Sequence, residues 1–238
     1  RLPAPPVLRY PCGMAGAPRF IHLRTHTEYS LLEGAVPVKK LVGLCDKMSM
    51  PAIAVTDTNN MFAALEFSTL AKGAGVQPIV GCQLSLDFDP AQAGEKPRPP
   101  APIVLLAQSE AGYENLMKLN SCLYLRGDGS LPHVLLDELA ARAEGLICLT
   151  GGPEGPIGRL LQAGQGAKAG ALLTRLAEIY PDRLYVELQR HPGEGGQYTE
   201  AEQATERGHV EMAYRMGLPI VATNDVYFPK PDMYEAHD

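Results

Sequence analysis

The chain of 238 residues has no tryptophan, only 6% aromatic residues, and no apolar run long enough to cross a membrane. Basic residues are also in short supply: 21 Lys and Arg stand against 27 Asp and Glu, a formal net charge of −6. This balance argues against a surface that grips nucleic acid along its length. The amino-terminal residues contain no apolar segment of the signal-peptide type. These absences favour a cytoplasmic protein that is neither membrane-spanning nor a general nucleic-acid binder.

Closely spaced cysteine pairs are absent as well. The five cysteines are scattered and lie mostly within apolar segments: Cys12, Cys45, Cys82, Cys122 and Cys148. An odd number does not suit a disulfide framework, and without a CxxC pair no structural zinc site is indicated. We therefore expect reduced thiols packed in the interior of a cytosolic protein.

What the chain does contain is typical of one large α/β domain, with 45% hydrophobic and 20% charged residues. Four apolar runs end in polar or ionisable residues, at 20–26, 52–57, 185–191 and 220–227. The carboxyl ends of strands converge on one site in an α/β barrel or a doubly wound sheet. We therefore expect these four ends to meet, with Arg24 and His26 projecting together from the first.

Hydrophobic periodicity predicts the secondary structure. Strands are expected at 20–23, 52–56, 77–82, 103–107, 146–150, 184–188 and 220–223, with a further extended run at 84–88. Helices are expected at 36–48, 61–72, 109–123, 131–144, 155–163, 167–180 and 198–216, with Asn59 or Asn60 capping the second, and with His133 and His209 on helix surfaces. Residues 1–19 read as a flexible extension and 89–102 as an exposed loop. About seven strands separated mostly by helices favour a closed or nearly closed parallel barrel.

Five motifs follow one another along the chain: HLRTHTEYSLLEG, MPAIAVTDTNNM, GVQPIVGCQLSL, LYVELQRH and LPIVATNDVYFPKPDMYEAHD. On these motifs the chain resembles the PHP (polymerase and histidinol phosphatase) domain. More narrowly, it resembles the amino-terminal PHP domain of the bacterial replicative DNA polymerase III alpha subunit, a C-family polymerase. The resemblance covers residues 20–238 and implies one α/β domain with the distorted (β/α)7 PHP barrel fold. Active members hydrolyse phosphoesters with up to three divalent metals held by His, Asp and Glu.

The resemblance also implies that four metal ligands are lost. Arg24 replaces the first histidine of an LHxH pattern, Thr58 the histidine of TDH, and Gln83 the glutamate of GxE, while Tyr227 stands where a histidine is common. The retained ligand positions are His26, Asp57, His191 and Asp225. A guanidinium cannot bind a metal, and a glutamine supplies no negative charge. We expect a residual PHP cleft with no catalytic residue and no metal cluster.

A weak single metal site at the four retained positions stays open at this point. In place of metal, Arg24 is expected to form an ion pair with Asp57 or Asp225, which would neutralise an orphaned carboxylate. A cation without such a partner would be costly to bury.

The resemblance implies a supporting role in DNA replication. Nucleotidyl transfer would belong to a separate palm domain with its own Mg²⁺, so this domain needs no cofactor. Its expected partners are the polymerase core of the same chain and the proofreading exonuclease subunit, with DNA reached only through the parent polymerase. The alternatives are an active metal-dependent phosphoesterase, either proofreading exonuclease or pyrophosphatase, or a barrel enzyme acting on small phosphorylated metabolites. The motifs do not separate the replicative subunit from its error-prone paralogue.

Overall fold

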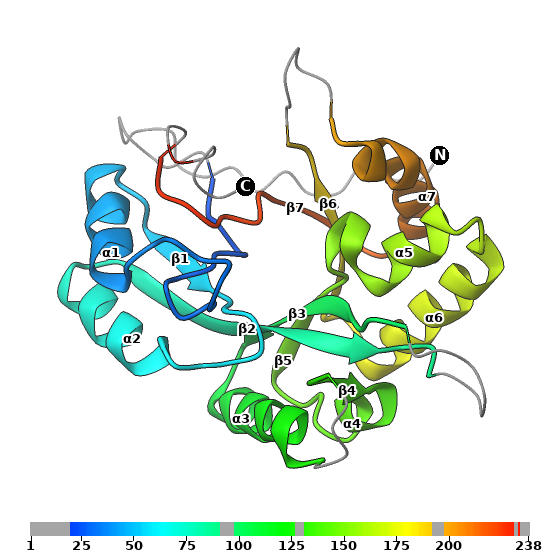
Figure 1. Ribbon diagram of the computed structural model, residues 1–238, viewed down its shortest axis with the longest axis horizontal. Coiled ribbons are helices and arrows are strands. Elements are labelled where there is room, and N and C mark those ends of the chain that lie inside the picture. Colours follow the sequence, from blue (N-terminus) through cyan, green and yellow to red (C-terminus); the bar gives the residue numbers. More distant parts are fainter. Residues whose placement is uncertain (1–19, 91–97, 127–130, 192–197, 231–232, 234–238) are drawn as a thin grey trace.

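A computed structural model describes residues 20–90, 98–126, 131–191, 198–230 and 233 (Figure 1). The expected extension at 1–19 lies outside the described residues, and so does part of the expected loop at 89–102. None of the helices in the described ranges has the length and hydrophobicity needed to cross a lipid bilayer.

One curled sheet forms the centre of the molecule. Its strands are β1 (Ala52–Val55), β2 (Gln77–Asp87), β3 (Ala101–Ala107), β5 (Leu146–Leu149), β6 (Leu184–Gln189) and β7 (Ile220–Thr223), paired in that order, and the short β4 (Val134–Leu135) pairs with β2. The sheet curves so that β1 and β7 lie on opposite sides of its opening (Figure 1). This is the α/β architecture of a distorted barrel, as expected.

The direction of one strand differs from the expected parallel barrel. Strand β3 is antiparallel to both of its neighbours, β2 and β5, whereas the other strand pairs are parallel. In the described residues no helix stands between β2 and β3, and antiparallel neighbours need no crossover connection. The runs at 77–82 and 84–88 are one long strand, because the polar Gln83 between them stays in the ladder.

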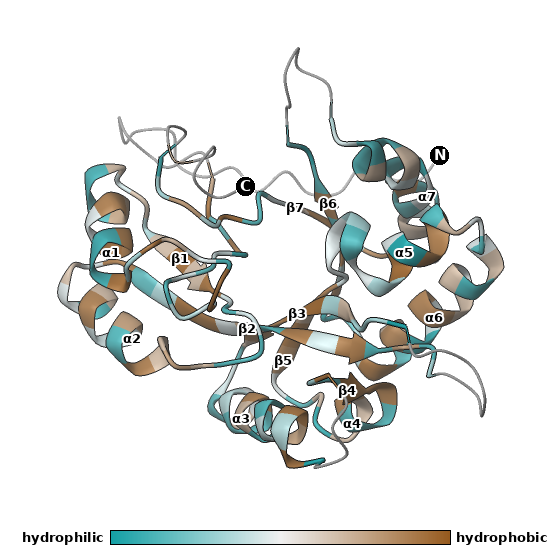
Figure 2. Ribbon diagram, viewed as in Figure 1, coloured by the Kyte–Doolittle hydropathy of each residue, from teal (hydrophilic) through white to brown (hydrophobic). Residues whose placement is uncertain are grey.

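The helices cover the outside of this sheet. They are α1 (Val38–Lys47), α2 (Ala64–Gly73), α3 (Glu110–Leu125), α4 (Leu136–Ala140), α5 (Pro156–Gln162), α6 (Gly166–Ile179) and α7 (Glu200–Met216), with a 3-10 turn η1 (Gly152–Glu154). Helices α1 and α2 share a core with β1, in which Leu41, Ile53 and Phe67 are buried. A larger core joins β2, β3 and β5 to α3, α5 and α6. Figure 2 shows how hydrophobic the central strands β3 and β5 are.

Two helix predictions were wrong in extent. The region 131–144 holds the short strand β4 and the five-residue helix α4, so His133 lies outside any helix. Helix α2 begins at Ala64 without a side-chain cap, because Asn60 instead accepts a hydrogen bond from the Phe62 amide in the preceding turn.

His209 was expected on a surface, but it is only 1% exposed. It lies on the face of α7 that packs inward, where its Nδ1 faces the Thr205 carbonyl oxygen at 3.1 Å. Burial lowers the pKa of His209 below its ordinary value of 6.5. The histidine therefore acts as a core residue of the helix.

The first expected strand, at 20–23, is not regular. Thr25 forms one isolated parallel bridge with Val226, and the Ala54 amide donates to the His22 carbonyl oxygen. The segment thus bonds to β1 on one side and to the residues after β7 on the other, at scattered positions that do not make a continuous ladder. It still fills the space between the two ends of the curled sheet, which places its polar residues at the mouth.

The cysteines in the described residues are free thiols. Cys45, Cys82 and Cys148 are buried, and Cys122 is partly exposed. Burial raises the pKa of Cys82 and of Cys148 well above the ordinary range. The expectation of packed thiols is confirmed for these three, while Cys12 lies outside the described residues.

A close backbone contact between α3 and the start of β5 provides a test of the fold. A Cβ on Gly112 would lie 1.8 Å from the Gly145 carbonyl oxygen, whereas one on Gly43 of α1 would meet nothing within 4 Å. We predict that Gly112→Ala lowers the free energy of unfolding by about 2 kcal/mol or more, because the backbone cannot yield as a side chain does. Gly43→Ala should raise it by up to about 1 kcal/mol, through helix propensity. Urea unfolding of both variants measures this; equal effects would contradict the described packing.

Candidate functional site

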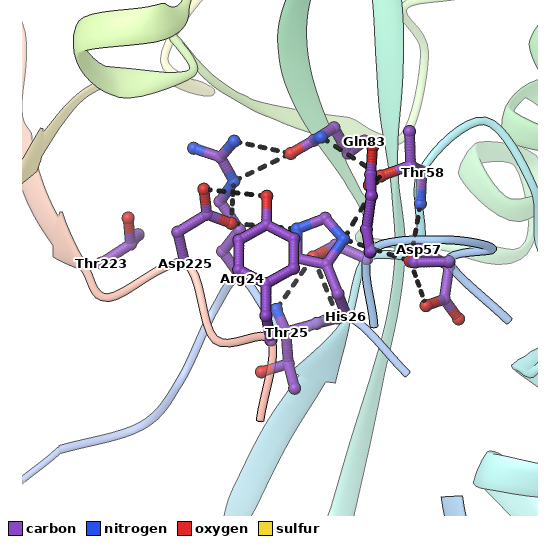
Figure 3. A network of polar contacts seen from close by, with 12 residues as sticks. Arg24, Thr25, His26, Asp57, Thr58, Gln83, Thr223 and Asp225 are labelled. Atoms are coloured by element: carbon purple, nitrogen blue, oxygen red, sulfur yellow. Dashed lines mark hydrogen bonds and ion pairs between the residues drawn. The ribbon is translucent and has the colours of Figure 1, made fainter. Parts of the chain in front are cut away.

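The guanidinium of Arg24 lies at the centre of a buried polar cluster at the mouth of the sheet (Figure 3). Arg24 is only 2% exposed. Its Nε and Nη2 donate to Gln83 Oε1 at 3.0 and 2.6 Å. Its Nη1 lies 3.2 Å from Glu187 Oε1, and its Nε lies 2.9 Å from Asp225 Oδ1. The side chain of Arg24 therefore connects the first segment to Gln83 of β2, to Glu187 of β6 and to Asp225, which follows β7. The expected ion pair with Asp225 is present.

Glu187 is one of two residues of the site that the sequence analysis did not predict. Its side chain is fully buried, and Oε1 accepts from Arg24, from the Thr223 hydroxyl, and from Gln189 Nε2 at 3.1 Å. Its Oε2 accepts from the backbone amide of Gly151 at 2.9 Å. A carboxylate within a strand that is otherwise mostly apolar must find partners when the strand is buried, and this was the available signal.

Asp225 is shared between Arg24 and two aromatic side chains. His26 Nε2 lies 2.9 Å from Asp225 Oδ1, and the Tyr227 hydroxyl donates to Oδ2 at 3.3 Å. The His26 and Tyr227 rings stack at a centroid distance of 4.3 Å and an angle of 6°. Since an ionised carboxylate only accepts hydrogen bonds, His26 Nε2 carries the hydrogen, and its lone pair is not available to a metal.

Asp57 binds the local loop, so of the two alternative partners expected for Arg24 only Asp225 forms the ion pair. Its carboxylate accepts from the Thr27 amide at 2.6 Å, from the Thr27 hydroxyl at 2.8 Å and from the Ser30 hydroxyl at 2.6 Å. In Figure 3 its carboxylate points away from Arg24. The retained aspartate thus fixes the turn that follows His26.

Gln83 and Thr58, at two of the lost ligand positions, extend the cluster toward α2. Gln83 accepts from Arg24 through Oε1 and donates through Nε2 to Thr58 Oγ1 at 3.3 Å. The Thr58 hydroxyl in turn donates to Glu33 Oε2 at 2.6 Å and lies 3.3 Å from His26 Nδ1. An amide with both a donor and an acceptor can make these two contacts, which a carboxylate could not.

His191 contacts Glu202 and the backbone of Asn224, and not the side chains around Arg24. Its side chain is 43% exposed, its Nδ1 lies 2.6 Å from Glu202 Oε1, and its Nε2 donates to the Asn224 carbonyl oxygen at 2.6 Å. Both ring nitrogens therefore face oxygen acceptors. Glu202, a second residue that sequence reasoning missed, also closes a capping box with Thr199 at the start of α7, a spacing visible in the sequence.

The charges in the cluster stabilise one another. Burial lowers the pKa of Arg24, but the carboxylates of Glu187 and Asp225 raise it more, so the net pKa is raised. Burial raises the pKa of Asp225, but Arg24 and His26 lower it more, so the net pKa falls below its ordinary value of 3.8. Burial and the Asp225 charge raise the pKa of Tyr227. At neutral pH the site thus holds a fixed cation, a fixed anion and a neutral phenol.

The residues present do not fit the divalent metals of active PHP members. Across the described ranges, no group of three or more His, Cys, Asp or Glu residues is arranged to hold a metal ion. Arg24 places a guanidinium between the carboxylates of Glu187 and Asp225, and both already accept several hydrogen bonds. A dication there would face a fixed positive charge at close range.

Removal of one member of the buried pair tests its role. We predict that Arg24→Met lowers the free energy of unfolding by about 3 to 5 kcal/mol, because Glu187 is left as an uncompensated buried charge. Adding Glu187→Gln should recover part of this loss. Chemical denaturation of the two single variants and the double variant gives the coupling energy; strictly additive losses would show that the two side chains do not interact.

The lowered pKa of Asp225 predicts a pH dependence. Because the ionised form is stabilised in the fold, its contribution is complete above the ordinary pKa of 3.8 and is lost as the pH falls through the lowered value. We expect Asp225→Asn to cost about 2 kcal/mol at neutral pH, with a smaller difference from the wild type below about pH 4. Urea unfolding across pH 2.5 to 7 measures this, and a difference that stays constant would refute the assignment.

The sequence is similar to a known domain family and to known proteins. A model of the PHP domain family matches residues 22–191. The DNA polymerase III subunit alpha of Caulobacter vibrioides is 43% identical over 221 residues, which make up 92% of this chain and 19% of that protein. The chain spans less than a fifth of the length of the curated relatives it matches.

Solved structures agree on the fold. An amidohydrolase from Chromobacterium violaceum, with bound sulfate and no metal, has a TM-score of 0.55 at 14% identity, and 89% of each chain is covered. A protein from Bifidobacterium adolescentis described as a metal-dependent phosphoesterase has a TM-score of 0.54, at the same identity and coverage. These similarities concern the fold alone. On the family match and the sequence identity, the chain belongs to the PHP domain family and is homologous to part of the bacterial DNA polymerase III alpha subunit.

Proposed function

We propose that this domain is the amino-terminal PHP domain of a bacterial DNA polymerase III alpha subunit and that it has no hydrolytic activity of its own. The names and lengths of its relatives support the first part, since this chain matches them over 92% of its own length but under a fifth of theirs. The domain would span residues 20–238 and act as a structural and docking module in DNA replication. The rest of the polymerase chain would carry nucleotidyl transfer.

The observation that carries the second part is the position of Arg24. Hydrolysis in this fold needs an activated water, which requires either a metal cluster or a free general base. Arg24 occupies the space between Glu187 and Asp225, and it uses both carboxylates as partners. Asp57 is committed to the backbone and hydroxyls of the neighbouring loop. The domain thus keeps the shape of the family site without the groups that would generate a nucleophile.

A structural role suits the network that replaces the metals. Arg24 joins residues 59 and 163 positions away along the chain in one buried cluster. We propose that the strand ends joined by this cluster support the polymerase core of the same chain and present a surface to the proofreading exonuclease subunit. The acidic net charge of −6 suits protein partners better than a direct DNA contact. The Mg²⁺ of polymerisation would be bound by the palm domain.

The competing function is an active metal-dependent phosphoesterase built on His26, Asp57, His191 and Asp225. The experiment that separates the two uses the full polymerase chain, treated with chelator and titrated with Zn²⁺ by calorimetry. A parallel assay follows hydrolysis of bis(p-nitrophenyl) phosphate. We predict no zinc binding that depends on the PHP residues and no zinc-dependent hydrolysis, because the guanidinium of Arg24 excludes a dication.

A restored variant provides the positive control. It carries the four family ligands through Arg24→His, Thr58→His, Gln83→Glu and Tyr227→His, and it should gain zinc binding over the wild type. Tight binding of more than one Zn²⁺ to the wild type, abolished by Asp225→Asn and accompanied by hydrolysis, would overturn the proposal.

A further inference from the structure

A β-turn in the segment that follows His26 carries two leucines that this domain leaves exposed. The Glu33 amide donates to the Ser30 carbonyl oxygen at 3.0 Å, which makes Leu31 and Leu32 the central residues of the turn. Their side chains are 74% and 107% exposed. Single exposed leucines are ordinary on a protein surface, whereas neighbouring apolar side chains that stay in water often mark a contact. The turn is therefore a candidate interaction surface.

The backbone of Leu32 provides a second observation. Its φ is 68°, a left-handed conformation that glycine and asparagine adopt readily and that crowds the Cβ of a leucine. Burial does not offset this strain, because the side chain stays exposed in the described part of the chain. Strained residues of this kind persist where the surrounding structure holds them, and they cluster at functional sites. A partner outside the domain would explain why the residue is a leucine.

The neighbouring residues hold the turn in one conformation. The Ser30 hydroxyl donates to Asp57 Oδ1 at 2.6 Å, and the Gly34 amide donates to the Ser30 carbonyl oxygen at 2.8 Å. A Cβ on Gly34 would lie 1.9 Å from the Thr27 carbonyl oxygen, so the chain closes tightly behind the turn. The leucines are thus presented in a fixed position, which lowers the entropy that a partner must remove on binding.

The exposed apolar surface continues onto the start of α2. Phe62 and Leu65 are 68% and 80% exposed. This part of the chain lies against the turn, because the Asn60 side chain donates to the Tyr29 carbonyl oxygen at 2.8 Å. The Tyr29 and Phe62 rings also meet edge to face, with their centroids 6.5 Å apart. We define the leucine-turn patch as Leu31, Leu32, Phe62 and Leu65.

Two exposed carboxylates lie at the edge of the leucine-turn patch. The Tyr29 hydroxyl donates to Glu66 Oε2 at 3.1 Å, and the Val38 amide donates to Glu28 Oε1 at 3.4 Å. Both donors are neutral, so these hydrogen bonds leave the two negative charges uncompensated. A complementary surface would have an apolar centre with lysine or arginine at its edge.

We propose that the leucine-turn patch binds the remainder of the polymerase chain, at a surface of apolar residues edged by lysine or arginine. The proposal rests on the proposed function in one respect, namely that the domain belongs to a longer polymerase chain. This chain covers 19% of the Caulobacter vibrioides protein, so most of such a polymerase lies outside the domain. Permanent contacts are more apolar than those of transient partners, and a covalent link keeps the two surfaces at high effective concentration.

Cysteine labelling of the full polymerase chain, purified without the exonuclease subunit, tests the contact. Leu32→Cys reports on the patch. Tyr214→Cys is the control, because Tyr214 is 79% exposed and α7 lies on the opposite side of the molecule from α2 (Figure 1). We expect a maleimide to react at position 32 at least about tenfold more slowly in the native than in the unfolded chain, since the contact must open first. Native and unfolded rates that agree at position 32, as for an exposed site, would overturn the proposal.

Replacing Leu32 by asparagine separates a contact from a purely local role. Asparagine tolerates a φ of 68°, so without a partner Leu32→Asn would leave the stability unchanged or raise it. With the contact, we expect the half-life of polymerase activity at a fixed elevated temperature to fall at least about threefold. Tyr214→Asn, the matched control, should leave the half-life unchanged. A half-life for Leu32→Asn equal to or longer than that of the wild type would contradict the contact.

A crosslinking measurement identifies the occupant. With p-benzoylphenylalanine at position 32 of the full chain, irradiation should join the turn to a segment of the same polypeptide outside this domain. A crosslink to a second copy, or protection of Leu32→Cys that disappears on dilution, would contradict the assignment. So would protection that appears only when the exonuclease subunit is added. These outcomes do not depend on phosphoester hydrolysis, which the zinc titration tests separately.

Discussion

The buried guanidinium of Arg24 is the constraint on which the mouth of this domain depends. A cation that is 2% exposed is tolerated only when carboxylates and hydrogen-bond acceptors surround it, because the cost of desolvation would otherwise be several kcal/mol. Glu187 and Asp225 supply the charge, and Gln83 supplies the acceptor. Each of these side chains comes from a different part of the sheet, so their positions are mutually determined.

On the function proposed above, this arrangement lets the PHP fold be retained without the metal cluster of active members. In an active site of this family, metal ions would balance the carboxylates at the strand ends. Here the positive charge belongs to the chain itself, and it stays in place whatever the metal supply. Hydroxyls of Thr58, Tyr227 and Thr223 satisfy the remaining acceptors. The residues at the four exchanged ligand positions therefore belong to one hydrogen-bonded network in which the charge of Arg24 is balanced by carboxylates.

Much of this was predictable from motifs, and the exceptions have physical causes. The order of the motifs predicted the barrel and an ion pair of Arg24 with Asp57 or Asp225, because strand ends converge; the pair with Asp225 is the one present. Local patterns could not reveal that β3 runs antiparallel, since strand direction depends on how the connections pack. Glu187 was not predicted because the resemblance identifies only the ligand positions, although a carboxylate in a buried strand needs a partner. The ring of His191 does not join the Arg24 network, because Glu202 and the Asn224 carbonyl oxygen are its partners.

The measurement that tests the central claim most directly is a crystal structure of the polymerase chain grown with Zn²⁺ or Mn²⁺, with anomalous diffraction data collected at the metal edge. The account predicts Arg24 between Glu187 and Asp225, with no anomalous peak among these side chains and His26. An anomalous peak bound by His26 and Asp225, with Arg24 displaced from its carboxylates, would contradict it.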